Sequence, residues 1–306
     1  MLSVILGLSG AVVYGVSDFF GGLGARHLGA LRLTWLSVVA GLVSTVIAFQ
    51  LSSGDWAGIT PETLLWGGLS GVSGSLGIMF LYASLAIGPM SIVSPLGAVV
   101  AATIPVLWEV AIGKLLSPLG YIAIVIALIA VFMVGFVKAE GAIRVRPQGI
   151  VFAVLAGVGI GGYLICMSRT AGDSGISPFV ANRVVAFCVL TLVVCVAWLI
   201  SRARKRGWFR SAGPASVDLL AGDTITTNWS RALIFARVCG VLDTLGNVLI
   251  LSGFRLGTLS VVGVLSALYP AGTIVLAALV LKEKIGRVQL AGMILALAAA
   301  ALLSLS

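Results

Sequence analysis

Charged side chains stand inside long apolar stretches of this sequence, where an ionised group is costly. They are Asp18, Glu109, Arg183, Arg237 and Asp243. Charged residues in a membrane-spanning segment usually line a polar cavity or pair with one another. Two kinds of chemistry suit these residues. A carboxyl group in a low dielectric can take up and release a proton near neutral pH, and an arginine can bind a carboxylate or phosphate group of a solute.

Asp243 is a candidate for proton exchange that couples solute movement to proton flow. It lies near the middle of its apolar stretch between two glycines, and Asn247 follows one helical turn later on the same face. Glycines there leave room for a ligand or a neighbouring helix to approach the carboxylate. The alternative is that Asp243 only pairs with Arg183 or Arg237, which would satisfy a buried charge without any transport role.

The other two acids have similar alternatives. Glu109 lies one turn after Pro105 and is either a second proton-exchanging group or a member of a structural ion pair. Asp18 either exchanges protons or reaches the lipid headgroups. Arg183 and Arg237 are candidates for binding an anionic solute, or for pairing with the acids.

Proline and aromatic residues supply the remaining candidates. Proline removes a backbone hydrogen bond inside a helix, so carbonyl groups freed near mid-membrane can bind cations or act as hinges. An ordinary packing kink is the alternative. The candidate hinges are Pro95, Pro105 and Pro270, and Tyr163 and Tyr269 are candidates for lining a cavity.

The residue types that usually hold metals are sparse. His27 is the only histidine, and the four cysteines lie in apolar stretches without C-x-x-C spacing. These features favour neither a zinc site nor a disulfide framework. We therefore expect no metal site, no catalytic residues and no bound cofactor.

The elements that carry these residues are predicted to be membrane-spanning helices. Of 306 residues, 60% are hydrophobic and 9% are charged, whereas a soluble domain is about 25% charged. Open sheets would leave backbone groups unpaired in lipid, so blocks of about 20 apolar residues predict helices. Ten spans are expected, at 2–24, 31–51, 63–87, 91–115, 119–137, 148–169, 177–201, 231–253, 258–281 and 285–305.

The net charge of +9 does not predict a nucleic-acid partner, because the basic residues lie in short loops beside the apolar spans. There they act as an orientation signal and face anionic lipid. Most of them fall in the odd-numbered connectors, including the strongly basic segment 202–210. With ten spans, this distribution predicts that both termini lie on the outer side of the membrane.

An internal repeat divides the chain. Residues 64–130 align without gaps with 233–299 at a constant offset of 169, so that Gly71 matches Gly240 and Gly77 matches Gly246. Gly15 matches Gly157 at a different offset. The predicted fold is an all-α polytopic membrane protein of two five-helix repeats, at 1–138 and 148–306, with a connecting loop at 139–147. Because each repeat has an odd number of spans, the copies must be inverted, a recurrent plan of secondary transporters.

The segment 257–292 carries a specific pattern. A turn of small residues precedes a helix with Pro270, a Leu-x-Glu end at Glu283 follows, and the next helix opens with Gln289 and Gly292. This pattern resembles the second-repeat signature of the EamA-type transporters in the drug/metabolite transporter superfamily. The pair Tyr14-Gly15 and the arginine Arg183 resemble further family positions. The sequence departs from the family pattern at Lys114, which stands where the first copy would carry the acid matching Glu283.

The resemblance implies a secondary active transporter that exports amino acids, drugs or other small metabolites. We expect proton coupling, a small-molecule substrate, a location in the plasma membrane and a monomeric or homodimeric state. Relatives are drawn with both termini cytoplasmic, which disagrees with the charge distribution. The alternatives are a flippase for lipids or lipid-linked carriers, and an integral-membrane lipid-modifying enzyme. Such enzymes usually carry clustered acids, and the sequence has no D-D-x-x-D motif.

Overall fold

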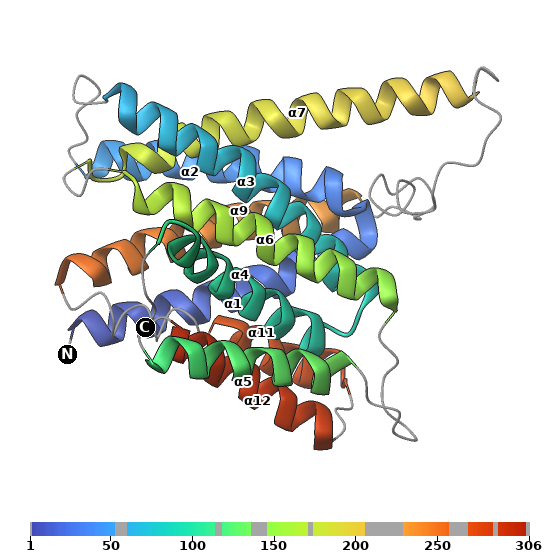
Figure 1. The fold of residues 1–306 in the computed structure, drawn as a ribbon. Helices are drawn as coiled ribbons and strands as arrows, with labels where there is room; N and C mark the ends of the chain where they lie inside the picture. Colours follow the sequence, from blue (N-terminus) through green and yellow to red (C-terminus); the bar gives the residue numbers. More distant parts are fainter. Residues whose placement is uncertain are drawn as a thin grey trace.

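The computed structural model describes residues 2–52, 60–113, 118–135, 146–170, 174–205, 229–256, 269–283 and 287–303. Within these ranges the regular structure is helical, and no strand occurs. The helices are α1 (Leu2–Leu28), α2 (Ala30–Leu51), α3 (Pro61–Ile87), α4 (Met90–Ala111), α5 (Pro118–Gly135), α6 (Pro147–Ser168), α7 (Ser177–Lys205), α9 (Trp229–Leu256), α11 (Tyr269–Val280) and α12 (Arg287–Leu303). They run roughly alongside one another as a bundle (Figure 1).

The structure confirms a multi-pass membrane protein. Among the described residues, six helical segments are long and apolar enough to cross a bilayer: Leu2–Leu28, Ala30–Leu51, Pro61–Ile87, Pro147–Ser168, Ser177–Arg202 and Leu233–Gly253. Shorter apolar stretches occur in α4, α11 and α12. The helices begin and end close to the predicted spans, except that only part of span 258–281 lies within the described residues. Ten crossings remain a prediction.

Several helices end a few residues away from the ends of the predicted spans, and two of these differences bring basic residues into helices. The first helix continues past residue 24 to Leu28, so Arg26 and His27 lie in its last turn and not in a loop. Basic side chains are favoured there by the helix dipole, and Leu28 is buried. Gly29, with φ of 79°, then turns the chain into α2 in a conformation that glycine adopts at little cost. Similarly, α7 continues through Lys205, which draws Arg202 out of the predicted loop.

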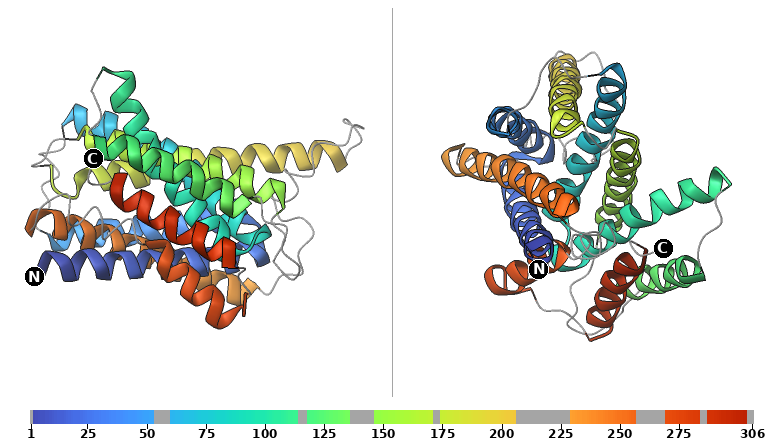
Figure 2. Two further views of the ribbon diagram at one scale, coloured as in Figure 1. Left: turned by 60° about the horizontal axis from the view of Figure 1, so that its bottom comes forward. Right: turned by 90° about the vertical axis from the view of Figure 1, so that its left-hand side faces the viewer.

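Helices from the two halves of the chain pack against each other in matching pairs. α1 packs against α9, and α3 packs against α6. In the same way α2 packs against α9, and α7 packs against α3. The contacts of α1 with α11 match those of α6 with α4. Seen end-on in Figure 2, α5 and α12 lie side by side at one edge of the bundle.

The glycines that match in the sequence lie at matching contacts. Gly71 of α3 packs against the Asn182 carbonyl of α7, and Gly240 of α9 packs against the Ser37 carbonyl of α2; a Cβ at either position would clash with that backbone. Small residues at such crossings let membrane helices approach closely. The repeat therefore marks the places where helix backbones touch.

The glycines that match at the second offset, Gly15 and Gly157, also lie at helix contacts. A Cβ on Gly15 of α1 would lie 2.5 Å from the Tyr269 carbonyl oxygen of α11, and a Cβ on Gly157 of α6 would lie 2.5 Å from Val100 Cβ of α4. Substituting either glycine would push the helix pair apart.

Candidate functional site

The centre of the candidate site is an ion pair between two helices of the second half. Arg183 of α7 donates through Nη2 to Oδ2 of Asp243 on α9, and the two side chains are only 9% and 16% exposed. Gly41 of α2 lies beside the guanidinium, since a Cβ there would lie 3.5 Å from Arg183 Cζ. Arginine is suited to such sites because its planar fork matches a carboxylate. The structure thus brings together two of the charged residues singled out in the sequence.

Asn247 and Tyr163 extend this pair into a polar network. The Asn247 amide donates to the Asp243 backbone carbonyl at 2.8 Å and to its Oδ2 atom at 3.3 Å. The Tyr163 hydroxyl of α6 donates to Oδ1 of Asn247 at 3.2 Å. The Asp243 carboxylate therefore has two polar partners, which fix its orientation.

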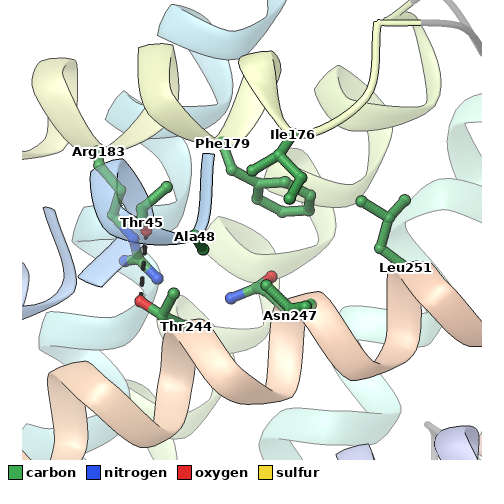
Figure 3. A pocket seen from close by; sticks show the side chains of 9 residues that line it. Thr45, Ala48, Ile176, Phe179, Arg183, Thr244, Asn247 and Leu251 are labelled. Carbon is green, nitrogen blue, oxygen red and sulfur yellow. Dashed lines mark hydrogen bonds between the residues drawn. The ribbon is translucent and has the colours of Figure 1, made fainter. Parts of the chain in front are cut away.

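A small cavity lies on one side of the ion pair. Its polar lining includes Thr45, Arg183, Thr244 and Asn247, and its apolar lining includes Phe179. Figure 3 shows these side chains converging between α2, α7 and α9, with Thr45 and Thr244 hydrogen-bonded at 3.3 Å. The lining therefore combines one cationic group and polar groups with apolar side chains.

A second small cavity lies on the other side of the pair. It is lined by Arg183 and Asp243 together with Ser37, Tyr82 and Cys239, among others. Each cavity has room for about one water molecule. The ion pair therefore separates two spaces that are both too small for an organic solute in this conformation.

Asp18 of α1 occupies a different environment. It is 8% exposed, and within the described residues its carboxyl group has neither a hydrogen bond nor an ion pair. Tyr82, Cys239 and Tyr269 lie within electrostatic range of the carboxyl group. The Tyr269 hydroxyl is buried and has no hydrogen-bond partner in the described part of the chain, and its ring lies edge-on to Tyr14 with centroids 6.5 Å apart. Asp18 is thus a buried acid surrounded by phenol and thiol groups.

Neighbouring hydrogen bonds hold the backbone beside Asp18 in place. The Ser17 hydroxyl donates to the Cys239 carbonyl at 3.1 Å, and the Cys239 thiol donates to the Ser17 carbonyl at 3.4 Å. This reciprocal pair ties α1 to α9. The position of Asp18 in the bundle is therefore fixed by two bonds that do not involve its own side chain.

The remaining predicted residues do not join these groups. Arg237 is exposed on α9, on a face away from Asp243. Glu109 lies on α4, but its side chain is outside the described part of the chain. α4 continues through Pro95 and Pro105 without ending. Pro270 is the second described residue of α11.

The described residues contain no group of three or more His, Cys, Asp and Glu side chains that could hold a metal ion. Reasoning from the sequence missed Thr45 and Thr244, whose hydroxyl groups line the first cavity. The signal in the sequence was that Thr244 directly follows Asp243 and lies three residues before Asn247.

Comparison with known proteins gave three results. The model of the EamA-like transporter family matches residues 147–305. A solved structure described only as "Crystal structure of protein" is similar over 99% of this chain and 97% of that chain, with a TM-score of 0.57 and 15% identity, a likeness that shows the fold alone. The curated proteins gave no significant match.

Proposed function

Because this chain belongs to the EamA-like transporter family, we propose that it is a proton-coupled exporter of small organic metabolites, such as amino acids or drugs. It would act in the plasma membrane as a secondary active transporter and not as an enzyme. The observation that carries this proposal is the buried Arg183–Asp243 pair, which lies between two small cavities in the middle of the bundle.

The matching helix contacts support an inverted repeat. Gly71 and Gly240 meet α7 and α2, and Gly15 and Gly157 meet α11 and α4, as two copies of one unit would. In an inverted repeat, each copy can adopt the conformation of the other, and this exchange exposes a central site first to one side and then to the other. The Arg183–Asp243 pair occupies a position that such an exchange would open alternately.

The ion pair is our proposed solute site. In the closed conformation each charged group satisfies the other, which avoids the cost of an isolated charge in lipid. A solute that carries an anionic group can replace Asp243 as the partner of Arg183. The hydroxyl groups of Thr45 and Thr244 would hydrogen-bond the same solute from the first cavity.

Asp18 is our proposed proton site. An ionised carboxylate without a counter-charge is unfavourable in this surrounding, so a proton would neutralise it. Asp243 is a weaker choice for this role, because Arg183 stabilises its charged form. Solute and proton would then bind at separate sites, the solute at Arg183 beside Asp243 and the proton at Asp18.

The first experiment identifies a solute. Purified protein is screened against a metabolite library for thermal stabilisation, since a ligand that binds the folded state raises its apparent stability. Hits are then tested in proteoliposomes with a pH gradient. We expect gradient-driven accumulation of at least one hit, and a loss of its binding in the double variant Arg183→Met with Asp243→Leu, which lacks the cation. Stabilising solutes that are never transported, or that bind this double variant equally well, would contradict the proposal.

A further inference from the structure

A carboxylate from the second half of the chain closes one end of the bundle. Glu283, three residues after the end of α11, accepts hydrogen bonds from the backbone N–H groups of Met90 and Ser91, both at 3.0 Å. It also accepts a bond from the Ser91 hydroxyl at 2.6 Å. Met90 is the first residue of α4, where N–H groups lack helical partners and favour a negative charge. We call this set of bonds the Glu283 latch.

A second tie lies beside the Glu283 latch. Arg26, in the last turn of α1, donates through Nη2 to the Leu85 carbonyl at 3.3 Å and to the Gly88 carbonyl at 3.5 Å. Glu283 lies within electrostatic range of the Arg26 guanidinium. The ends of α1, α3 and α11 and the start of α4 are therefore bound together at one end of the bundle.

The side chains beneath the latch fill the path inward. Leu85 and Met90 are fully buried and pack against Gly22 of α1. Tyr82, one turn of α3 further inward, lines the cavity next to the Arg183–Asp243 pair. Cys239, which is also fully buried, lines the same cavity. Anything that enters from this end must displace the residues that the latch holds.

We propose that Glu283 is a gate residue, and that release of its carboxylate from Met90 and Ser91 opens this end of the bundle toward Asp18 and the Arg183–Asp243 pair. This inference rests on the proposed transport function. The latch joins α4 of the first half to the segment after α11 of the second half, so a rocking motion of one half against the other would break it. At the matching position of the first copy the sequence has Lys114 in place of an acid. The first copy therefore lacks an acid that could make the same set of bonds.

Cys239 provides a built-in reporter. With Cys166, Cys188 and Cys195 replaced by serine, it is the remaining cysteine of the four in the chain. A membrane-impermeant methanethiosulfonate is added to either side of proteoliposomes with known protein orientation, and the rate of Cys239 modification is measured. The assay needs neither a solute nor a proton gradient, so its result is independent of whether the proposed cargo or coupling ion is right.

Glu283→Ala is expected to raise the modification rate about tenfold or more from the latch side alone, since hydrogen bonds to a charged acceptor are lost. Ser91→Ala, which loses one of the bonds, should give a smaller increase. Glu62→Ala, an exposed acid in the first turn of α3 at the other end, is the matched control and should leave the rate unchanged.

Two results would contradict the proposed gating role of Glu283. One is an unchanged rate in Glu283→Ala, and the other is an equal increase from both sides, which would indicate general loosening. If Glu283→Ala does not fold, as judged by size-exclusion chromatography in detergent, Glu283→Gln replaces it. A rate in Glu283→Gln equal to that of the parent would then reject the proposal.

Discussion

Two buried acids in this molecule are held in opposite ways. Asp243 has a counter-charge in Arg183 and a hydrogen bond from Asn247. Asp18 is also buried, but within the described residues its carboxyl group has no such partner. A paired acid tends to stay ionised, whereas an unpaired one is more stable with a proton. In the mechanism proposed above, the two acids therefore have different roles: Asp243 contributes to the solute site, and Asp18 binds the proton.

The repeat sharpens this comparison. At the offset of 169, Asp243 matches Gly74 and Asn247 matches Ile78. A Cβ on Gly74 would lie 3.2 Å from the Tyr163 ring, so the first copy places glycine where the second carries the acid. The two copies share their helix contacts but not their polar groups. The matching glycine contacts are therefore not accompanied by matching polar groups.

Removing the counter-charge should have the largest effect. Arg183→Ala leaves Asp243 buried and unpaired, which we expect to cost about 3–5 kcal/mol of stability. Thermal unfolding in detergent measures the loss. The double variant Arg183→Met with Asp243→Leu removes both charges and should recover most of it. Arg237→Ala, at an exposed position on α9, is the control and should change little. Equal losses in Arg183→Ala and Arg237→Ala would contradict a paired site.

Asp18→Asn should change stability little but should strongly reduce proton-driven transport. Because Asp18 has no counter-charge to leave behind, the stability of the protein should change by about 1 kcal/mol at most, well below the loss expected for Arg183→Ala. Accumulation of the identified solute against a pH gradient should fall to the level without a gradient, while solute exchange at equal pH continues. Glu62→Gln is the control for both measurements. Gradient-driven accumulation that survives in Asp18→Asn would move the proton site elsewhere.

The sequence predicted the scaffold better than the site. The glycine pairs of the repeat found the helix contacts, because a backbone crossing requires a small residue whatever surrounds it. The charged residues were found because few exist. Neither the Glu283 latch nor the link from Thr45 to Thr244 was predicted. Lipid and protein interior are both apolar here, so the sequence does not reveal which face of a helix points inward, and partners on neighbouring helices cannot be assigned.

Asn247→Ala should have an intermediate effect on the solute site. The change removes two hydrogen bonds to Asp243 and one from Tyr163, and we expect a loss of about 1 kcal/mol in stability. Tyr163→Phe removes one bond and should cost less. Solute affinity, measured by concentration-dependent thermal stabilisation, should weaken in the same order. If Tyr163→Phe weakens solute affinity more than Asn247→Ala does, Tyr163 contacts the solute directly, and support of Asn247 is not its main role.

Tyr269→Phe should have the smallest effect on folding and tests the environment of Asp18. Its hydroxyl is buried and has no hydrogen-bond partner among the described residues, so its removal should be neutral or slightly stabilising. Thermal unfolding checks this expectation, with Tyr163→Phe as the matched loss of a bonded hydroxyl. If the Tyr269 hydroxyl donates to ionised Asp18 during transport, the variant should bind the proton more tightly, because the ionised carboxylate loses a donor. Proton release, and with it gradient-driven flux, would then slow while stability stays unchanged. A destabilised Tyr269→Phe with normal flux would mean that this hydroxyl has a structural partner in the membrane-embedded protein, and that Asp18 releases its proton without help from it.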